Sequence, residues 1–146
     1  MRTQLPNGPT LTDYNVIVYG LKTNSWSRLQ GISKQYYLSG VWGIFMAGAL
    51  HWIAIKTLGS ESCLLILDLG VKNYREVQMP KVENKNVNDM CIVRFEKSLS
   101  VLEYHHHVRI DVWVMNNYGV ANSWCKLSTV GQPEVIRSFV SIRPMA

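Results

Sequence analysis

The feature that most constrains the fold of this chain is a phrase that returns about every 49 residues. A short apolar run, a polar turn and an aromatic residue make up VYGLKTNSWSRL, ILDLGVKNYREV and VWVMNNYGVANSWCKL. The aromatic residues Trp26, Tyr74 and Trp124 are separated by 48 and 50 residues, and Leu50 and Leu99, in a second pair of similar phrases, by 49. A fixed period of this length predicts an architecture of repeated supersecondary units.

Each full repeat contains four short apolar or alternating runs bounded by turn residues, a pattern that indicates β-strands rather than helices. The runs lie at 41–46, 49–55, 63–69 and 74–79 in one repeat, and at 90–94, 97–103, 108–115 and 123–129 in the next. Ala47-Gly48 suits a two-residue hairpin turn, because glycine accepts the positive φ that such a turn requires. Each repeat is therefore expected to form an antiparallel sheet.

Four antiparallel strands that recur at this spacing are typical of a β-propeller blade. We predict an all-β fold, a partial kelch-like propeller whose two full blades cover 41–79 and 90–129. The period leaves room for a half blade at 14–30 and for the first strand of a further blade at 137–142. Residues 1–146 would then be one propeller domain that is incomplete as a ring, since propellers have about four to eight blades.

The recurring aromatic residues have a structural explanation. A single blade cannot bury both faces of its sheet, and large aromatic side chains are suited to filling the space between neighbouring blades. We assign this role to Trp26, Tyr74 and Trp124, and take Trp52 and Trp113 as further structural aromatics. All five are expected in the core rather than in a ligand site.

Charge and composition exclude several classes of protein. The net charge of +5 raises the possibility of a nucleic-acid partner, but the basic residues are dispersed and form no run or helical stripe, so none is expected. No apolar run approaches the roughly 20 residues of a membrane-spanning helix, and no signal-peptide pattern is present. Three scattered cysteines indicate reduced core thiols. We expect a soluble protein of the cytoplasm or nucleus without a membrane partner.

No metal site or cofactor is predicted from the histidines. His105, His106 and His107 are consecutive, and successive side chains of a strand point to opposite faces, so all three cannot bind one ion. A solvated loop is the preferred interpretation. His51, in GALHW, has no nucleophile motif beside it and is interpreted as a core histidine.

The acidic residues do not predict catalysis either. They are scattered among strands and turns, so no catalytic residues are assigned and the chain is predicted not to be an enzyme. Asp68 and Asp111 lie beside repeated turns, where a carboxylate can accept backbone N–H bonds and fix a loop.

The candidate binding residues lie in loops, because loops at the ends of a scaffold usually carry its binding sites. Four polar segments are longer than hairpin closure requires, at 56–62, 81–89, 105–107 and 116–122. Within them we single out Lys56, Glu61, Asn84, Lys85, His105, His106, His107, Asn117 and Tyr118.

The phrases VYGLKTNSW, GALHWIAI, LDLGVKNYREVQMP and DVWVMNNYGVANSW, followed by KLSTV, resemble the F-box-associated domain of plant F-box proteins. This type of domain is related to kelch propellers and is also found in S-locus F-box proteins. The motifs occur in the family's order across residues 16–130.

The resemblance implies a substrate-recognition module of a Skp-cullin-F-box ubiquitin ligase, which binds a protein target for ubiquitination. The sequence contains no F-box motif, so contact with a Skp-type adaptor is implied only through a module outside this chain. Three alternatives stay open: a truncated non-functional fragment, a competitor that binds the target without delivering it, and a propeller-type enzyme.

Overall fold

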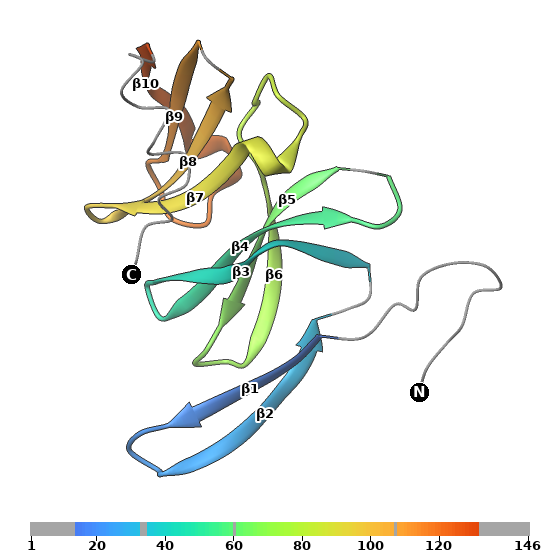
Figure 1. The fold of residues 1–146 in the computed structure, drawn as a ribbon. Helices are drawn as coiled ribbons and strands as arrows, with labels where there is room; N and C mark the ends of the chain where they lie inside the picture. The colour runs from blue at the N-terminus through green and yellow to red at the C-terminus, as the bar shows by residue number, and fades with distance from the viewer. Residues whose placement is uncertain (1–13, 33–34, 60, 107, 132–146) are drawn as a thin grey trace, which may run out of the picture.

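A computed structural model of the chain describes residues 14–32, 35–59, 61–106 and 108–131 (Figure 1). These residues form ten β-strands in three antiparallel sheets, with two short 3-10 helices and no α-helix. Within the same ranges no helix is long and apolar enough to cross a membrane. The prediction of an all-β fold is confirmed.

The three sheets are built in the same way, each from strands that are neighbours in the sequence. The first is a hairpin of β1 (Tyr14–Gly20) and β2 (Ser25–Ile32). The second contains β3 (Tyr36–Met46), β4 (Ala49–Lys56), β5 (Ser62–Asp68) and β6 (Asn73–Gln78). The third follows the 3-10 helix η1 (Val87–Asp89) and contains β7 (Met90–Phe95), β8 (Ser98–His105), β9 (Arg109–Met115), then η2 (Ala121–Ser123) and β10 (Trp124–Gly131).

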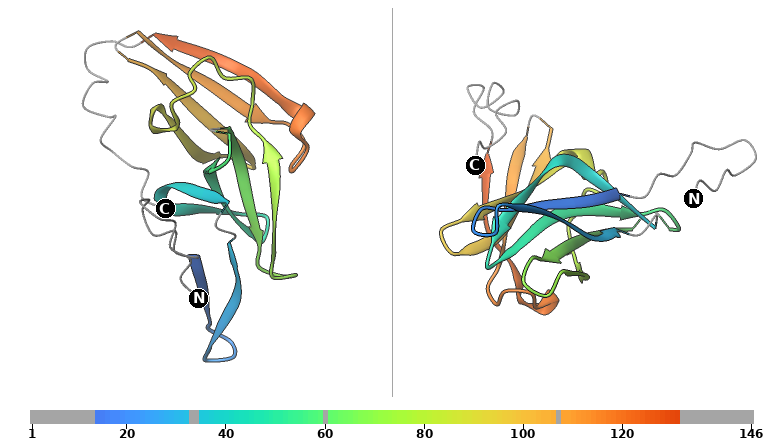
Figure 2. Two further views of the ribbon diagram at one scale, coloured as in Figure 1. Left: turned by 90° about the vertical axis from the view of Figure 1, so that its right-hand side faces the viewer. Right: turned by 90° about the horizontal axis from the view of Figure 1, so that it is seen from below.

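The second and third sheets have the form of propeller blades, since all four strands are hydrogen bonded in chain order and antiparallel. Figure 2 shows the three sheets as separate leaves that follow one another, and they do not close into a single barrel. The predicted architecture of partial propeller blades agrees with this arrangement.

The turn at Ala47-Gly48 sets the register of the second sheet. Ala47 and Gly48 have φ values of 50° and 74°, the pair of positive angles that a tight two-residue hairpin requires, and Met46 pairs with Ala49 across the turn. Such a turn leaves no freedom to slip by one residue, a shift that would move every side chain of β4 to the opposite face. The hairpin expected at this dipeptide is confirmed.

The continuous apolar run in β5 reflects a strand that is buried on both faces. Cys63 and Leu65 pack with Ile32 of the first sheet, whereas Leu64 and Ile66 pack with Leu99 of the third. Because successive side chains of a strand point to opposite faces, an apolar residue is needed at every position of a strand that lies between two other sheets. β5 is therefore the centre of the described part of the molecule.

Four of the five aromatic residues singled out in the sequence lie between sheets. Trp52 and Tyr74 pack against residues of the first sheet, and Trp113 and Trp124 pack in clusters shared by the second and third. The indole Nε1 of Trp124 also donates a hydrogen bond to the carbonyl oxygen of Gln78 in β6, at 2.9 Å. Tyr74 and Trp124 thus each face the sheet that precedes their own.

Trp26 departs from this pattern and corrects the prediction. Its side chain is 71% exposed and contacts the ring of Tyr19 in the same hairpin, with ring centroids 4.9 Å apart. The reason is positional: among the described residues no sheet precedes β1 and β2, so the face that Trp26 occupies has nothing to cover it. Its expected place in the core is therefore wrong for the chain as described.

The predicted strand positions agree with the structure except at β3. This strand begins at Tyr36 rather than at residue 41. The sequence pattern missed its first half because a register shift between Ser39 and Ile44 interrupts the alternation of side chains. The strand predicted at 137–142 lies outside the described residues. The division of residues 1–146 into a half blade at 14–30 and blades at 41–79 and 90–129 remains a prediction.

The turns lie at two opposite ends of the sheets. The turns 21–24, 47–48, 69–72, 96–97 and 116–123 join odd-numbered to even-numbered strands, and we call the end that they form the hairpin-turn end. Backbone contact joins two of them, since the amide of Leu69 donates to the carbonyl oxygen of Gly48 at 3.1 Å. The segments after β4, β6 and β8 form the opposite end, the connection end (Figure 1).

Candidate functional site

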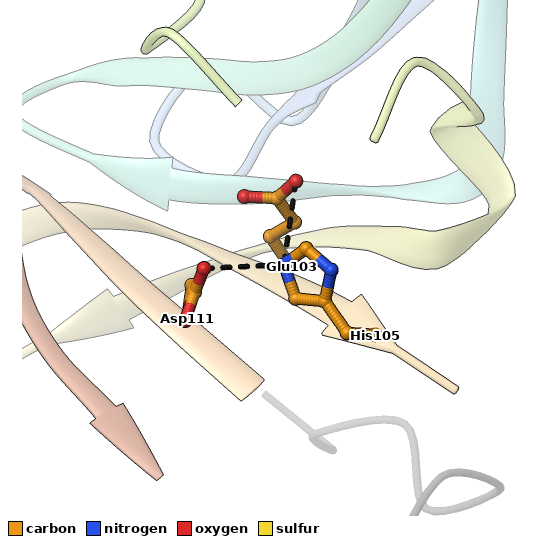
Figure 3. Close-up of side chains that lie close together, drawn as sticks. All are labelled: Glu103, His105 and Asp111. Carbon is orange, nitrogen blue, oxygen red and sulfur yellow. Dashed lines mark hydrogen bonds and ion pairs between the residues drawn. The ribbon is translucent and has the colours of Figure 1, made fainter. Parts of the chain in front are cut away.

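A cluster of buried polar side chains lies on the third sheet, towards the connection end. Glu103 of β8 is directly opposite Asp111 of β9, and both side chains are fully buried. His105 lies two residues beyond Glu103 and so projects from the same face of the sheet. Its Nε2 is 3.1 Å from Asp111 Oδ2 and 3.6 Å from Glu103 Oε1 (Figure 3).

The charge of Asp111 is balanced by three neighbouring donors. Lys126 Nζ lies 2.9 Å from Oδ2, Thr129 Oγ1 donates to Oδ1 at 2.7 Å, and Arg109 Nε lies 3.3 Å from Oδ1. Burial alone would raise the pKa of Asp111, but the hydrogen bonds from Lys126, Thr129 and Arg109 together lower the pKa of Asp111 well below its usual range. The carboxylate is therefore ionised at neutral pH.

Glu103 joins the sheet to the long connection between β6 and β7. Its Oε1 accepts the backbone amide of Asn84 at 2.5 Å, and its Oε2 accepts the indole Nε1 of Trp113 at 3.2 Å. The Asn84 side chain in turn donates to Asp89 Oδ2 at 2.9 Å, and His106 Nε2 is 2.6 Å from Asp89 Oδ1. Three predicted binding residues, Asn84, His105 and His106, are thus brought together.

The ligand atoms of Glu103, His105 and Asp111 lie within 4.8 Å of one another, a spacing that one metal ion could bridge. Asp111, however, already accepts hydrogen bonds from Lys126 and Arg109, and Glu103 accepts them from Asn84 and Trp113. A cation would have to displace the positive charge at Asp111 to enter. The arrangement is therefore suited to holding loops in place. That the chain has no metal or cofactor site remains a prediction.

The other predicted binding residues do not form one surface. Lys56 is ion paired with Glu76 at 2.6 Å, and Glu61 and Lys85 are exposed at the connection end. Asn117 and Tyr118 lie at the hairpin-turn end, and His107 lies outside the described residues. The candidate loops therefore divide between the two ends of the sheets.

A second polar contact joins the second and third sheets at the hairpin-turn end. His51 of β4 is fully buried, with Nδ1 2.8 Å from the carbonyl oxygen of Ile44 and Nε2 2.8 Å from the hydroxyl of Tyr118. The guanidinium of Arg75 lies 5.8 Å from the centre of the Tyr118 ring. Burial lowers the pKa of His51, the hydrogen bond to Ile44 opposes this, and nearby Arg75 lowers the pKa of His51 further. The prediction of a satisfied core histidine is confirmed.

Two aspartates expected to organise turns behave differently. Asp68 does so, since its Oδ1 accepts the backbone amides of Gly70 at 2.8 Å and Val71 at 3.0 Å. The interpretation of Asp111 was wrong: its partners are side chains brought to it by the pairing of β9 with β8 and β10. Glu103, Lys126 and Thr129 were not singled out in the sequence, because only the register of the strands brings them close to Asp111.

The leaves of four antiparallel strands define the class of fold as a β-propeller assembled from blades, and comparison with known proteins gives the family. The model of the F-box associated beta propeller domain matches residues 3–143, and the chain belongs to this family. The family resemblance of its motifs is confirmed.

Several curated relatives come from Arabidopsis thaliana. The chain is 31% identical to F-box protein CPR1 over 90% of its own length, and 29% identical to F-box protein At4g22390 over 89%. It is 25% identical to F-box/WD-40 repeat-containing protein 1 over 82% of its length, which is 30% of that relative. The chain spans only 35% of the length of each of the first two relatives. No solved structure matches it significantly.

Proposed function

We propose that this chain is the substrate-recognition module of a Skp-cullin-F-box ubiquitin ligase and that it binds a protein target for ubiquitination. The observation that carries the proposal is the family match across residues 3–143, together with relatives that are named F-box proteins. In this role the propeller segment holds the target, and a Skp-type adaptor is contacted through an F-box module.

The geometry of the connection end supports a binding role. Asn84, His105 and His106 are held by hydrogen bonds and ion pairs to buried or half-buried groups, so the loops that carry them are ordered before any partner arrives. Binding by such a preorganised surface avoids most of the entropy cost of ordering loops. The same logic applies to Tyr118, whose hydroxyl is fixed by His51.

The polar cluster supports binding rather than catalysis. A general acid or base needs an atom that can exchange a proton with a substrate, within hydrogen-bond reach. Glu103 and Asp111 are completely buried, and both carboxylates are occupied by protein donors. We therefore propose that the chain is a binding protein without enzymatic activity.

The proposal can be tested by appending the full chain to the F-box module of a related plant protein and expressing the fusion in plant cells. We expect the fusion to co-purify with a Skp-type adaptor and to raise the ubiquitination of a specific set of proteins, whereas the chain alone raises none. A fusion that is folded and binds the adaptor but changes the ubiquitination of no protein would contradict the proposed function.

A further inference from the structure

The same exposed feature occurs at the hairpin-turn end of all three sheets. In each, a glycine precedes an exposed aliphatic residue of the turn before the last strand, at Gly20-Leu21, where Gly20 ends β1, and at Gly70-Val71 and Gly119-Val120. Leu21 is 87% exposed, Val71 75% and Val120 48%. Leu21 and Val71 lie mostly outside the hydrophobic core and Val120 about half outside it, so each sheet presents apolar surface at this end.

The charges at this end are also distinctive. Lys22, Lys72 and Lys97 belong to its turns, and the side chains of Arg75 and Arg94 donate to the turn carbonyl oxygens of Gly119 and Glu96. The acidic residues in these turns or next to them are Asp68 and Glu96. None of the five basic residues forms an ion pair with a described residue. The Oδ1 of Asp68 accepts the backbone amides of Gly70 and Val71, so Asp68 is held by its own turn.

The opposite end provides the contrast. The ion pairs among described residues involve groups of the connection end or of the strands that lead to it, with partners Lys56–Glu76, His106–Asp89, Arg109–Glu83 and Lys126–Asp111. Lys56, Arg109 and Lys126 are thus paired within the protein, whereas Lys81 and Lys85 form no ion pair with a described residue. At the hairpin-turn end Arg75 and Arg94 bond to backbone carbonyl oxygens, and Lys22, Lys72 and Lys97 have no ion-pair partner among the described residues.

We propose that the hairpin-turn end is a docking surface for an acidic protein segment that carries apolar side chains. Glutamates or aspartates of the segment would lie against Lys22 and Lys72, and its apolar residues would cover Leu21, Val71 and Val120. This inference rests on the proposed function and names the chemistry of the target. A protein fits better than a nucleic acid, because aliphatic side chains offer bases no stacking surface.

Binding of defined probes to the full chain tests the proposal by fluorescence anisotropy. The first probe is a short labelled peptide in which glutamate alternates with leucine and phenylalanine; the second replaces every glutamate with lysine, and the third replaces every apolar residue with serine. We expect the first peptide to bind at least about tenfold more tightly than the other two, with an affinity that falls as salt is raised.

Two pairs of variants with matched controls locate the site. Lys22→Glu with Lys72→Glu is expected to weaken binding of the first peptide by about tenfold or more, and Lys72→Glu alone should weaken it clearly, whereas Lys81→Glu, the same single charge reversal on the segment before β7, changes it less than about twofold. Leu21→Ser with Val71→Ser should also weaken binding. Leu58→Ser, at a residue that is 90% exposed at the connection end, should not.

Three outcomes would overturn the docking surface: the lysine peptide binding equally well, the control variants weakening binding as much as the test variants, or a single-stranded oligonucleotide displacing the peptide through Lys22 and Lys72. The ligase role is judged separately. A target that the F-box fusion still ubiquitinates after Lys22→Glu with Lys72→Glu would remove this surface and leave the ligase role. If the fusion ubiquitinates no protein, the proposed ligase role is wrong, and the docking surface then has no ubiquitination target to bind.

Discussion

His51 of the second sheet and Tyr118 of the third form a hydrogen bond across the boundary between the sheets, with 2.8 Å between the imidazole Nε2 and the phenol oxygen. The imidazole Nδ1 lies 2.8 Å from the carbonyl oxygen of Ile44, which can only accept, so Nδ1 carries the proton in the neutral ring. Nε2 therefore accepts the hydrogen bond that Tyr118 donates. The contact couples the sheets through a fully buried group.

Replacing Tyr118 with phenylalanine should destabilise the chain by about 1–3 kcal/mol, because Nε2 of His51 would be left buried without a partner. The free energy of unfolding in urea, followed by tryptophan fluorescence, measures the change. Tyr37→Phe is the control, at a side chain that is 61% exposed and for which no hydrogen bond is seen among the described residues. Equal losses in the two variants would show that the link between His51 and Tyr118 contributes nothing.

The stability of the chain should fall below neutral pH because of His51. Burial holds the pKa of His51 below its ordinary value of 6.5, so the unfolded chain binds the proton first. The contribution of the neutral imidazole is fully present above pH 6.5 and is lost as the pH falls from there towards the lowered pKa. Urea unfolding between about pH 8 and pH 5.5 should show this slope.

His51→Gln supplies the comparison for the pH experiment, since it removes the titrating ring and leaves His105 and His106 in place. The variant should be less stable at every pH and should lose most of the slope. A slope that persists unchanged in His51→Gln would assign the pH dependence to another group.

The strands and turns could be predicted from the sequence because they depend on local patterns. The positive φ values of the turn at Ala47-Gly48 and the apolar run of β5 are properties of neighbouring residues. Burial between sheets is not local. Trp26 and Trp124 occupy equivalent places in the repeat, yet only Trp124 finds a preceding sheet to pack on.

The polar cluster on the third sheet likewise depends on contacts that are not local in the sequence, and it could not be predicted from the sequence. Glu103, Asp111 and Lys126 are far enough apart in the sequence that only the pairing of β8, β9 and β10 brings them together. A bulge between Lys126 and Ser128 further shifts the register by an amount that composition does not reveal. The sequence indicated a solvated loop at the histidines, which is wrong for His105: it belongs to β8 and is held by buried carboxylates that could be found only from register.

Asp111→Asn should destabilise the chain by about 3 kcal/mol, since it leaves Lys126 without its buried counter-ion and weakens the bonds from Thr129 and Arg109. The free energy of unfolding in urea at neutral pH gives the value. Because the pKa of Asp111 is lowered in the folded chain, the ionised carboxylate contributes to the free energy of unfolding at pH values above the ordinary aspartate pKa of 3.8. This contribution is lost as the pH falls below 3.8.

The matched control for that substitution is Asp68→Asn, whose amide oxygen can still accept the backbone bonds of the turn. It should cost less than about 1 kcal/mol. If Asp68→Asn proved as damaging as Asp111→Asn, the balance of charges around Asp111 could not be the source of the effect.

Gly43→Ala should lower the melting temperature, because a Cβ added at Gly43 would lie 2.6 Å from Cε2 of Trp52. Trp52 is buried against Leu29 of the first sheet, so its ring cannot move aside without opening the contact between the first and second sheets. Overpacking of this kind costs about 1–3 kcal/mol, more than alanine recovers by restricting the unfolded chain. Gly131→Ala, where a Cβ meets no atom of the described residues within 4 Å, should leave the melting temperature unchanged or raise it slightly. If the two alanines melted alike, β3 would have room to shift beneath Trp52, and the packing between the sheets would be looser than the contact implies.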